Sequence, residues 1–391
     1  MDRGDAVVIG GGVMGASIAY HLARRGVGRT VLLEKATVCS GTSAKSSAIV
    51  RTHYTTRPTA TMALLARRMM ETFREDVGAE CGFVRTGMLV IGTAEGRDGM
   101  AQTVAMNREL GIETGFVSRE EARRIDPLVD PPEGAPIVYE PRSGYGNPHD
   151  VAQSYARRFV ELGGVLHQGA EVTAIDTAGG RVRAVRSTGG DVTAGAVVIA
   201  AGPWAQRVGR LAGIDLPVAA YRESIVTLHP RVPYGNDHPV VADLGNGVYF
   251  RPETGGFILL GSTREPPEPP GDPDRYEDRP YPAYVEDVVG RLARVMPAAV
   301  DAEIAGGWSG MYEVTPDWNP IMGQAAGLDG LYYCVGFSGH GFKLSPAAGL
   351  LMAELMAAGR ASTLDLSPYR LERFAEGHAF RIAYPQASVI A

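Results

Sequence analysis

A glycine-rich turn near the amino terminus is the first group of residues whose spacing points to a ligand. Gly10, Gly12 and Gly15 satisfy the pattern G-x-G-x-x-G between an apolar run that predicts a strand and an amphipathic run that predicts a helix. Glycine lets the backbone approach a pyrophosphate, and the helix start supplies N–H donors. Glu34 follows 19 residues after Gly15, where its carboxylate can accept hydrogen bonds from ribose hydroxyls. The unit predicts a bound adenine dinucleotide, either NAD or FAD.

Two further glycine-rich junctions favour FAD over NAD. One ends the apolar run 197–201 at Gly202 and Trp204, and the other spans residues 335–343. A plain NAD enzyme has no evident use for the second junction. A helix that starts just after Gly341 can direct its positive end toward the N1–C2=O side of an isoalloxazine ring. A non-catalytic NAD-binding sensor stays open as the alternative.

Composition excludes several classes of function. Of the 391 residues, 45% are hydrophobic and 21% are charged, which is typical of a folded globular protein. The net charge of −6 disfavours nucleic-acid binding. The three cysteines, Cys39, Cys81 and Cys334, show no C-x-x-C spacing, so we expect no disulfide framework, no metal site and a cytoplasmic location. No run of about 18 apolar residues occurs, so we expect no membrane span.

The order of predicted elements indicates an α/β (α+β) fold. A strand–helix–strand unit over 6–34 begins the chain, and residues 217–261 predict strands without intervening helices. We expect helices over residues 62–77, 97–125, 148–162, 285–296 and 344–358, and strands over 85–92, 171–176, 181–187, 191–194, 196–200, 307–312 and 331–335. This order predicts a Rossmann-like FAD-binding domain with an inserted, mainly antiparallel β-sheet substrate domain. The expected FAD-binding domain comprises residues 1–85, 145–215 and 318–391, and the substrate-binding or interface domain comprises 86–144 and 216–317.

Several strings together resemble the FAD-dependent amino acid oxidoreductases that include D-amino acid oxidase, glycine oxidase and sarcosine oxidase. The strings are residues 41–43 leading to 49–51, residues 308–312 with 315–317, and residues 336–343. The similarity runs essentially end to end and is greatest to the sarcosine oxidase branch. In that branch the residues matching Arg51 and Lys343 clamp the substrate carboxylate, and the residue matching Tyr312 lines the site.

The resemblance implies oxidation of an amino acid C–N bond by hydride transfer to flavin N5, giving an imine that hydrolyses. A small secondary or N-methyl amine, such as sarcosine or a proline-like compound, is the expected substrate. Three alternatives stay open: a D-amino acid dehydrogenase, a 2-hydroxy acid dehydrogenase, and a flavin-bearing β-type subunit of a heteromeric amine dehydrogenase. A homo-oligomer is also possible. His340 is expected either to brace the loop near the flavin or to act as an acid or base.

The sequence departs from that branch at several positions. Gly310 replaces the cysteine that binds FAD covalently, so we expect non-covalent FAD. Leu259 replaces an oxygen-activating lysine, which leaves open whether O₂ or another molecule accepts the electrons. Ala48 and Ala44 stand where the branch has an arginine and a histidine near the flavin. His149 could carry an extra FMN, as in heteromeric sarcosine oxidases, or could simply cap a surface helix.

Lysine is rare in this chain, and its positions are informative. Lys35, Lys45 and Lys343 are three of the 38 basic residues, and all lie in segments assigned to cofactor or substrate. A compact ammonium differs from a guanidinium in size and in how readily its pKa shifts on burial. We hypothesise that Lys45 supplies positive charge beside the flavin in place of the groups missing at Ala48 and Leu259.

These arguments together give an expected site and one segment of uncertain role. Catalysis is assigned to Arg51, Lys343, Tyr312, Lys45 and His340. The expected cofactor-binding residues are Gly10, Gly12, Val13, Met14, Gly15, Glu34, Lys35, Thr42, Ser43, Val172, Gly202, Trp204, Gly310, Gly339, His340, Gly341, Phe342 and Lys343. Residues 264–282 contain seven prolines, which predicts a solvated loop or, alternatively, a lid or partner-docking segment.

Overall fold

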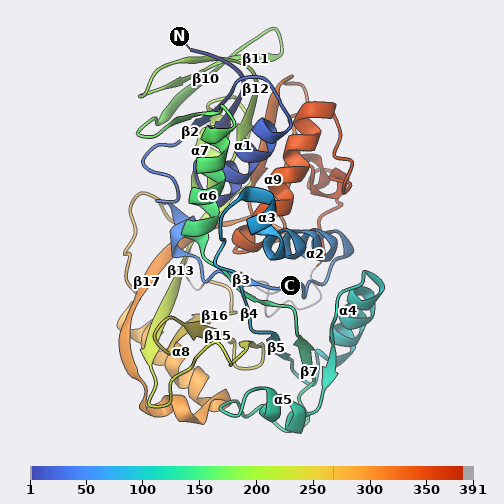
Figure 1. Ribbon diagram of the computed structural model, residues 1–391, viewed down its shortest axis with the longest axis vertical. Coiled ribbons are helices and arrows are strands. Elements are labelled where there is room, and N and C mark those ends of the chain that lie inside the picture. Colours follow the sequence, from blue (N-terminus) through green and yellow to red (C-terminus); the bar gives the residue numbers. More distant parts are fainter. Residues whose placement is uncertain (1, 267, 382–391) are drawn as a thin grey trace.

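The first of two large sheets has eight strands and lies in the upper half of the molecule in Figure 1. The computed structural model describes residues 2–266 and 268–381. The strand order is β10-β11-β12-β1-β2-β9, and β19 pairs with β12 and β18. The strands are β1 (Asp2–Ile9), β2 (Thr30–Leu33), β9 (Val165–His167), β10 (Val172–Ala178), β11 (Arg181–Ser187), β12 (Val192–Ile199), β18 (Ile321–Gln324) and β19 (Leu331–Val335). The pairs among β9, β2, β1, β12 and β19 are parallel.

Helices bury both faces of this sheet. On β1, Ala6 and Val8 belong to the core beneath the helices α1, α6 and α9, while Val7 and Ile9 belong to the core on the opposite face, which includes α7. A parallel strand buried on both sides needs a continuous apolar run, as this one has. The helices on this half are α1 (Val13–Arg24), α2 (Arg57–Glu71), α3 (Phe73–Val77), α6 (Pro148–Glu161), α7 (Ala205–Arg210) and α9 (Gly341–Ala358).

The second large sheet lies in the lower half of Figure 1 and is mainly antiparallel. Its order is β17-β13-β16-β15-β14-β5-β7-β6, and the β14–β5 pair is parallel. The strands are β5 (Met88–Ile91), β6 (Gly115–Val117), β7 (Ile137–Glu140), β13 (Ala219–His229), β14 (Val240–Asp243), β15 (Val248–Glu253), β16 (Phe257–Ser262) and β17 (Glu303–Val314). The accompanying helices are α4 (Arg97–Glu109), α5 (Arg119–Ile125) and α8 (Pro282–Val295), of which α8 packs its apolar side on β13, β15 and β16.

A small three-stranded sheet lies where the chain passes between these halves. It pairs β8 (Gly144–Tyr145) with both β3 (Ile49–Val50) and β4 (Val84–Arg85). Arg51 follows β3 directly, so this sheet fixes the start of the segment that carries the expected carboxylate clamp.

The expected fold class is confirmed, and several element predictions need correction. The prediction of a single helix over 97–125 is wrong. Gly111, at φ +81°, turns the chain after α4, and the strand β6, which pairs with β7, lies between α4 and α5 in the chain. A capping box of Ser118 and Glu121 starts α5. The two strands expected over 191–194 and 196–200 form one strand, β12 (Val192–Ile199), because Gly195 continues it without a break. The division into domains at the stated boundaries stays a prediction.

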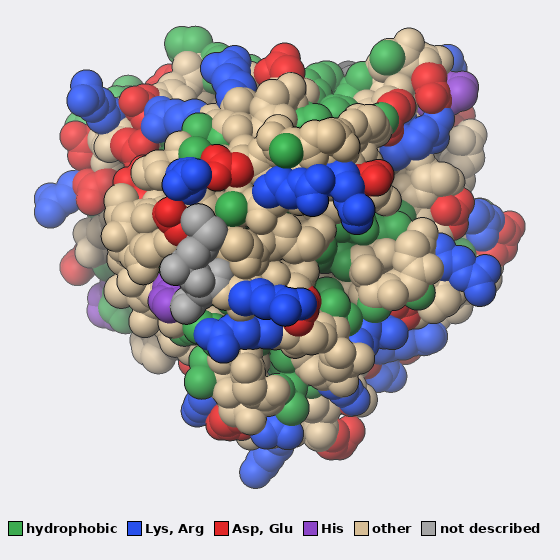
Figure 2. Space-filling model, turned by 90° about the horizontal axis from the view of Figure 1, so that it is seen from above, with side chains coloured by type: hydrophobic (Ala, Val, Ile, Leu, Met, Phe, Trp, Pro, Cys, Tyr) green, Lys and Arg blue, Asp and Glu red, His purple; other side chains and the backbone are tan. Residues whose placement is uncertain are grey.

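The outer surface mixes charges of both signs. On the face in Figure 2, Lys and Arg side chains are interspersed with Asp and Glu side chains, as a net charge of only −6 would suggest. Within residues 2–266 and 268–381, no helix is both long and apolar enough to cross a bilayer.

Candidate functional site

A cavity of about 670 Å³ lies between the two large sheets. The first sheet contributes the carboxyl ends of β1 and β2, and the second contributes residues of β13, β15 and β17. Ligands of open α/β sheets bind at the carboxyl ends of parallel strands, because the helices that follow present their N-termini there.

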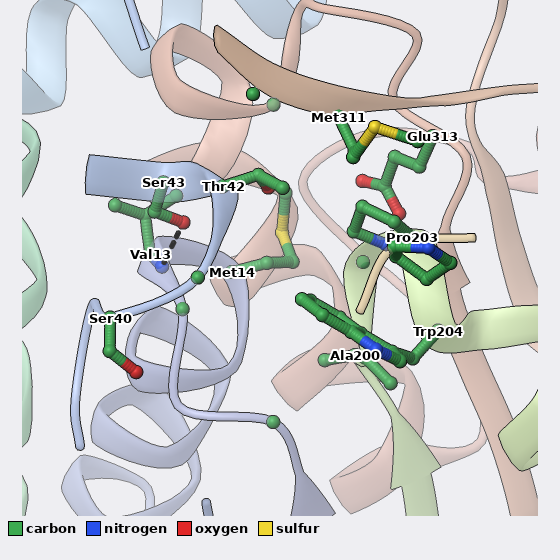
Figure 3. Close-up of a pocket in the computed structure, with 18 of the residues that line it drawn as sticks. Val13, Met14, Ser40, Thr42, Ser43, Ala200, Pro203, Trp204, Met311 and Glu313 are labelled. Carbon is green, nitrogen blue, oxygen red and sulfur yellow. Dashed lines mark hydrogen bonds between the residues drawn. The ribbon is translucent and has the colours of Figure 1, made fainter. Parts of the chain in front are cut away.

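The glycine turn forms one end of the cavity and leaves no room for side chains. A Cβ atom added at Gly10, whose φ is +111°, would lie 2.4 Å from the carbonyl oxygen of Ala200, and one at Gly15 would lie 1.8 Å from the Gly10 oxygen. The first amide of α1, that of Val13, donates to Ser43 Oγ at 3.1 Å (Figure 3). The turn therefore keeps bare backbone against the cavity.

Glu34 lies at the end of β2, next to the glycine turn. Its Oε2 accepts from the backbone N–H of Gly11 at 2.6 Å, and its Oε1 accepts from that of Ala36 at 2.8 Å. Each carboxylate oxygen retains a lone pair, since an ionised carboxylate can accept about four hydrogen bonds. Glu34 is thus held by backbone donors in an orientation that still allows it to receive ligand hydroxyls.

Residues 272–276 of the proline-rich segment, which was expected to be a solvated loop or a lid or docking segment, cover part of the cavity, while Asp274 and Arg275 are also exposed to solvent. Asp274 accepts from Lys35 Nζ at 2.7 Å, from Trp204 Nε1 at 2.8 Å and from Arg207 Nη1 at 2.6 Å. The Lys35 ammonium also lies 3.8 Å from the centroid of the Trp204 ring. Pro273, Asp274 and Tyr276 line the cavity. Pro267, within the same segment, lies outside the described residues.

Lys45 lies on the cavity wall beside Gly310. A Cβ atom added at Gly310 would lie 3.0 Å from the Lys45 Cβ. The Lys45 ammonium donates to Tyr276 Oη at 2.8 Å, and its backbone carbonyl accepts from Trp308 Nε1 at 2.9 Å. The lysine therefore connects β17 with the segment that covers the cavity.

Arg51, His340 and Lys343 form a buried cluster immediately behind the cavity. His340 Nδ1 lies 3.3 Å from Arg51 Nη2 and 3.2 Å from Tyr54 Oη, and the guanidinium carbon of Arg51 lies 4.1 Å from the centroid of the Tyr54 ring. Burial, with the charge of Arg51, lowers the pKa of Lys343 well below its usual value. Burial, together with Lys343 and Arg51, also lowers the pKa of His340 well below its usual value, so its ring is neutral.

Tyr312 and Gly339 form the wall between this cluster and the cavity. The Lys343 ammonium donates to the Gly339 carbonyl at 3.4 Å. A Cβ atom added at Gly339 would lie 2.6 Å from the Tyr312 ring, so only glycine permits this packing. Both Gly339 and Tyr312 line the cavity, whereas Arg51, His340 and Lys343 do not. The cationic groups thus stand one residue layer behind the wall.

Most of the other residues expected from the sequence do line the cavity. Gly15 does not, because it packs α1 onto β1 instead. Those on the cavity wall are Gly10, Gly12, Val13, Met14, Glu34, Lys35, Thr42, Ser43, Lys45, Val172, Gly202, Trp204, Gly310, Tyr312, Gly339, Gly341 and Phe342. Leu259 is buried in an apolar cluster with Ile225 and Tyr249. His149 is exposed, at the first turn of α6.

Two cavity carboxyl groups, Glu223 on β13 and Glu313 on β17, were not expected from the sequence. Burial raises the pKa of Glu223 to about 8 and that of Glu313 to about 7. One carboxyl oxygen of each is buried and has no hydrogen-bond partner within residues 2–266 and 268–381. Neither glutamate stands out in the sequence, because β13 also carries Arg222 and Ser224 and β17 also carries Glu303. Asp274 was missed as well, because its partners are distant in sequence.

The residues of the cavity suit the dinucleotide cofactor that the glycine turn implies. The bare backbone of the turn suits a pyrophosphate, and Glu34 suits a ribose. Gly310 and Gly339 have no side chains, and Lys45 and Tyr312 pack directly against them on the cavity wall. These residues fit FAD.

Comparison with known proteins decides the family. The family model described as FAD dependent oxidoreductase (DAO) matches residues 5–355. The chain belongs to this family. As an FAD-dependent oxidoreductase, it is an enzyme and FAD is its cofactor.

Individual members of the family are similar over nearly the whole chain. Glycine oxidase of Geobacillus kaustophilus is 31% identical over 381 residues, which cover 95% of this chain and 97% of the relative. Sarcosine oxidase subunit beta of Rhodobacter capsulatus is 27% identical, covering 96% of this chain and 89% of the relative. The crystal structure of L-proline dehydrogenase from P. horikoshii superimposes with a TM-score of 0.88 at 27% identity and covers 96% of this chain and 99% of that one.

Proposed function

We propose that this FAD-dependent oxidoreductase oxidises the C–N bond of a small amino acid whose amine is secondary, such as sarcosine or proline. The observation that carries the proposal is the buried ammonium of Lys343 beside Arg51. Within the described chain its hydrogen-bond partner is the Gly339 carbonyl, and no carboxylate lies within ion-pair distance of it. A buried charge is stable only with a counter-charge or strong hydrogen bonds, so this lysine is suited to an anionic ligand.

Arg51 and Lys343 would bind the substrate carboxylate after the Tyr312–Gly339 wall adjusts. A guanidinium binds a carboxylate through two parallel hydrogen bonds, and the lysine adds a point charge. His340 is neutral and contacts both Arg51 and Tyr54. We assign it the role of a positioning residue for Arg51. FAD, when bound, supplies the acceptor for the hydride, which carries two electrons away from the substrate carbon.

Three similarities support an amino acid substrate. The relatives described above are named for glycine, sarcosine and L-proline. The last two compounds are secondary amines with a carboxylate on the adjacent carbon. A site in which Arg51 and Lys343 bind the carboxylate while the amine lies against the cavity wall suits all three compounds.

The experiment that tests the proposal is anaerobic mixing of the purified enzyme with sarcosine, L-proline, D-amino acids and 2-hydroxy acids. The absorbance of oxidised flavin is followed, and air is then admitted. We expect a secondary amino acid to remove the oxidised flavin band. Bleaching by D-amino acids or by 2-hydroxy acids alone would overturn the proposed substrate class.

A second candidate is a flavin-bearing subunit of a heteromeric enzyme, and the similarity to sarcosine oxidase subunit beta supports it. Copurification of a second chain from the native host, with flavin reduction only in its presence, would establish this candidate. The three cysteines are buried free thiols, which supports the cytoplasm as the proposed location.

A further inference from the structure

Glu223 faces the cavity from the middle of β13. In the β13–β17 ladder it pairs directly with Gly310, and its neighbour two residues along, Ile225, pairs with Trp308. Partners in an antiparallel ladder point to the same face of the sheet. Lys45 packs over Gly310 where a side chain would stand, so the Glu223 carboxyl borders a part of the cavity that Lys45 and Tyr312 also line. Glu223, Gly310, Lys45 and Tyr312 all line the cavity.

The environment of Glu223 leaves its carboxyl group available to a ligand. Its Oε1 is buried and has no hydrogen-bond partner among the described residues, and an unsatisfied buried carboxyl oxygen is unfavourable. Burial raises its pKa to about 8. The charged and titratable groups that interact electrostatically with it are Arg222, Tyr249, Glu268, Tyr284, Arg291 and Tyr312. Lys45 packs over Gly310, its ladder partner, and also lines the cavity.

Glu223 and the cationic cluster lie on opposite sides of Tyr312. On one side, the Tyr312 ring packs against Gly339, whose carbonyl accepts from Lys343. On the other side, Tyr312 interacts with Tyr249, and Glu223 interacts electrostatically with both tyrosines. An amino acid is a dipolar ion, so this arrangement offers its carboxylate and its ammonium separate sites of opposite charge.

Glu313, the other unpartnered carboxyl, has different neighbours. The backbone N–H groups of Gly336 and Phe337 act on its carboxyl and oppose the rise in its pKa. In Figure 3, Met311 and Glu313 lie near Pro203 and Trp204, which belong to the glycine-rich junction that follows β12. Glu223 is therefore the better placed of the two for a group bound beside Tyr312.

We propose that Glu223 is a catalytic residue that binds the substrate ammonium and accepts one proton from it. In this step an N–H bond of the ammonium breaks, an O–H bond forms on the Glu223 carboxylate, and the amine keeps the electron pair. The step supplies the neutral amine whose lone pair assists loss of hydride from the adjacent carbon. It rests on the proposed function, because it requires an amino acid as substrate.

The test compares the FAD-bound wild-type enzyme with Glu223→Gln in anaerobic rapid mixing with sarcosine and L-proline at several pH values. We expect the variant to reduce flavin about 10²-fold more slowly, the magnitude typical of a lost proton acceptor. We also expect it to lose the rise in rate that the wild type shows as pH passes through about 8. Affinity for propionate, a carboxylate without an amine, should stay within about twofold of the wild type, because Arg51 and Lys343 are intact.

Two controls keep the outcomes separate. Glu303→Gln removes an exposed carboxyl from the far end of β17 and should leave the rate unchanged. Glu223→Asp retains a carboxyl group and should recover part of the rate and the pH-dependent rise, which also tests the proposal if the glutamine variant fails to fold. Equal rates and equal pH profiles for wild type and Glu223→Gln would overturn this role. Failure of the wild type to bind propionate or to be reduced by either amino acid would instead overturn the proposed function.

Discussion

The ammonium of Lys343 donates a hydrogen bond to the carbonyl of Gly339, 3.4 Å away. Gly339 lies in the glycine-rich segment that precedes α9. Gly339 has a φ of +86° and contacts the Tyr312 ring so closely that a side chain would collide with it. A single glycine therefore connects a buried cation to the cavity wall.

Replacing Lys343 with methionine should weaken carboxylate binding. Losing one charged partner of a buried ionic contact costs about 2–5 kcal/mol, so we expect the dissociation constant for propionate to rise by roughly 10²-fold. The flavin content should not change. Titration followed by the flavin spectrum measures the effect, and Arg68→Met, which removes an exposed cation from α2, serves as the control. Unchanged propionate affinity in Lys343→Met would remove this lysine from the substrate site.

Carboxylate binding should weaken as the pH rises. Burial and Arg51 lower the pKa of Lys343 in the free enzyme, and a bound anion stabilises its charged form and so raises that pKa. Between the two pKa values, binding must therefore take up a proton. Isothermal titration calorimetry of propionate in buffers of different ionisation enthalpy measures this uptake. Proton release, or a dissociation constant that does not increase with pH, contradicts the assignment.

Asp274 should help to retain the cofactor. It joins the cover segment, residues 272–276, to Lys35, Trp204 and Arg207 on the opposite side of the cavity. These groups are partly exposed, so each contact contributes little, and we expect Asp274→Ala to raise the FAD dissociation constant by roughly tenfold. Fluorescence of released FAD on dilution measures the change. Glu277→Ala, a variant at an exposed position in the same segment, should have the FAD dissociation constant of the wild type. If Glu277→Ala weakened FAD binding as much as Asp274→Ala does, Asp274 would not be the residue that holds the cover segment in place.

The flavin should be released on denaturation. Gly310 offers no nucleophile. Cys334, which lines the cavity, is a thiol whose pKa burial raises well above its usual value, and a thiol in that state is unreactive. After acid precipitation, all of the yellow colour should be in the supernatant. Flavin that remained in the pellet would show a covalent bond at a residue not considered above.

Lys45→Met should slow both flavin reduction and reoxidation in air, by roughly tenfold, if the lysine supplies positive charge beside the flavin as we propose. Its ammonium is held in place by Tyr276. Tyr276→Phe keeps the charge but removes that hydrogen bond, so it should lie between the variant and the wild type. Rates for Lys45→Met that equal those of the wild type would end this proposal.

The sequence predicted the parts of the site that depend on short-range pattern. Gly10 to Gly15 and Glu34 belong to one strand–helix–strand unit, so local spacing was enough to place them. The positions of Arg51 and Lys343 came from the resemblance to a family, since nothing local marks a lysine as buried. Glu223 required the register of β13 against β17, and Asp274 required contact with Lys35, 239 residues away in the chain. Such contacts depend on tertiary packing and cannot be obtained from periodicity.

The most direct test of the carboxylate site is anaerobic flavin reduction by matched pairs of amines with and without a carboxylate. L-Proline is compared with pyrrolidine, and sarcosine with dimethylamine, at equal concentrations and at one pH. The buried pair of Arg51 and Lys343 predicts that at least one of the amino acids removes the oxidised flavin band while its carboxylate-free partner does not. Reduction by pyrrolidine or dimethylamine as fast as by the corresponding amino acid would contradict the central role assigned to Arg51 and Lys343.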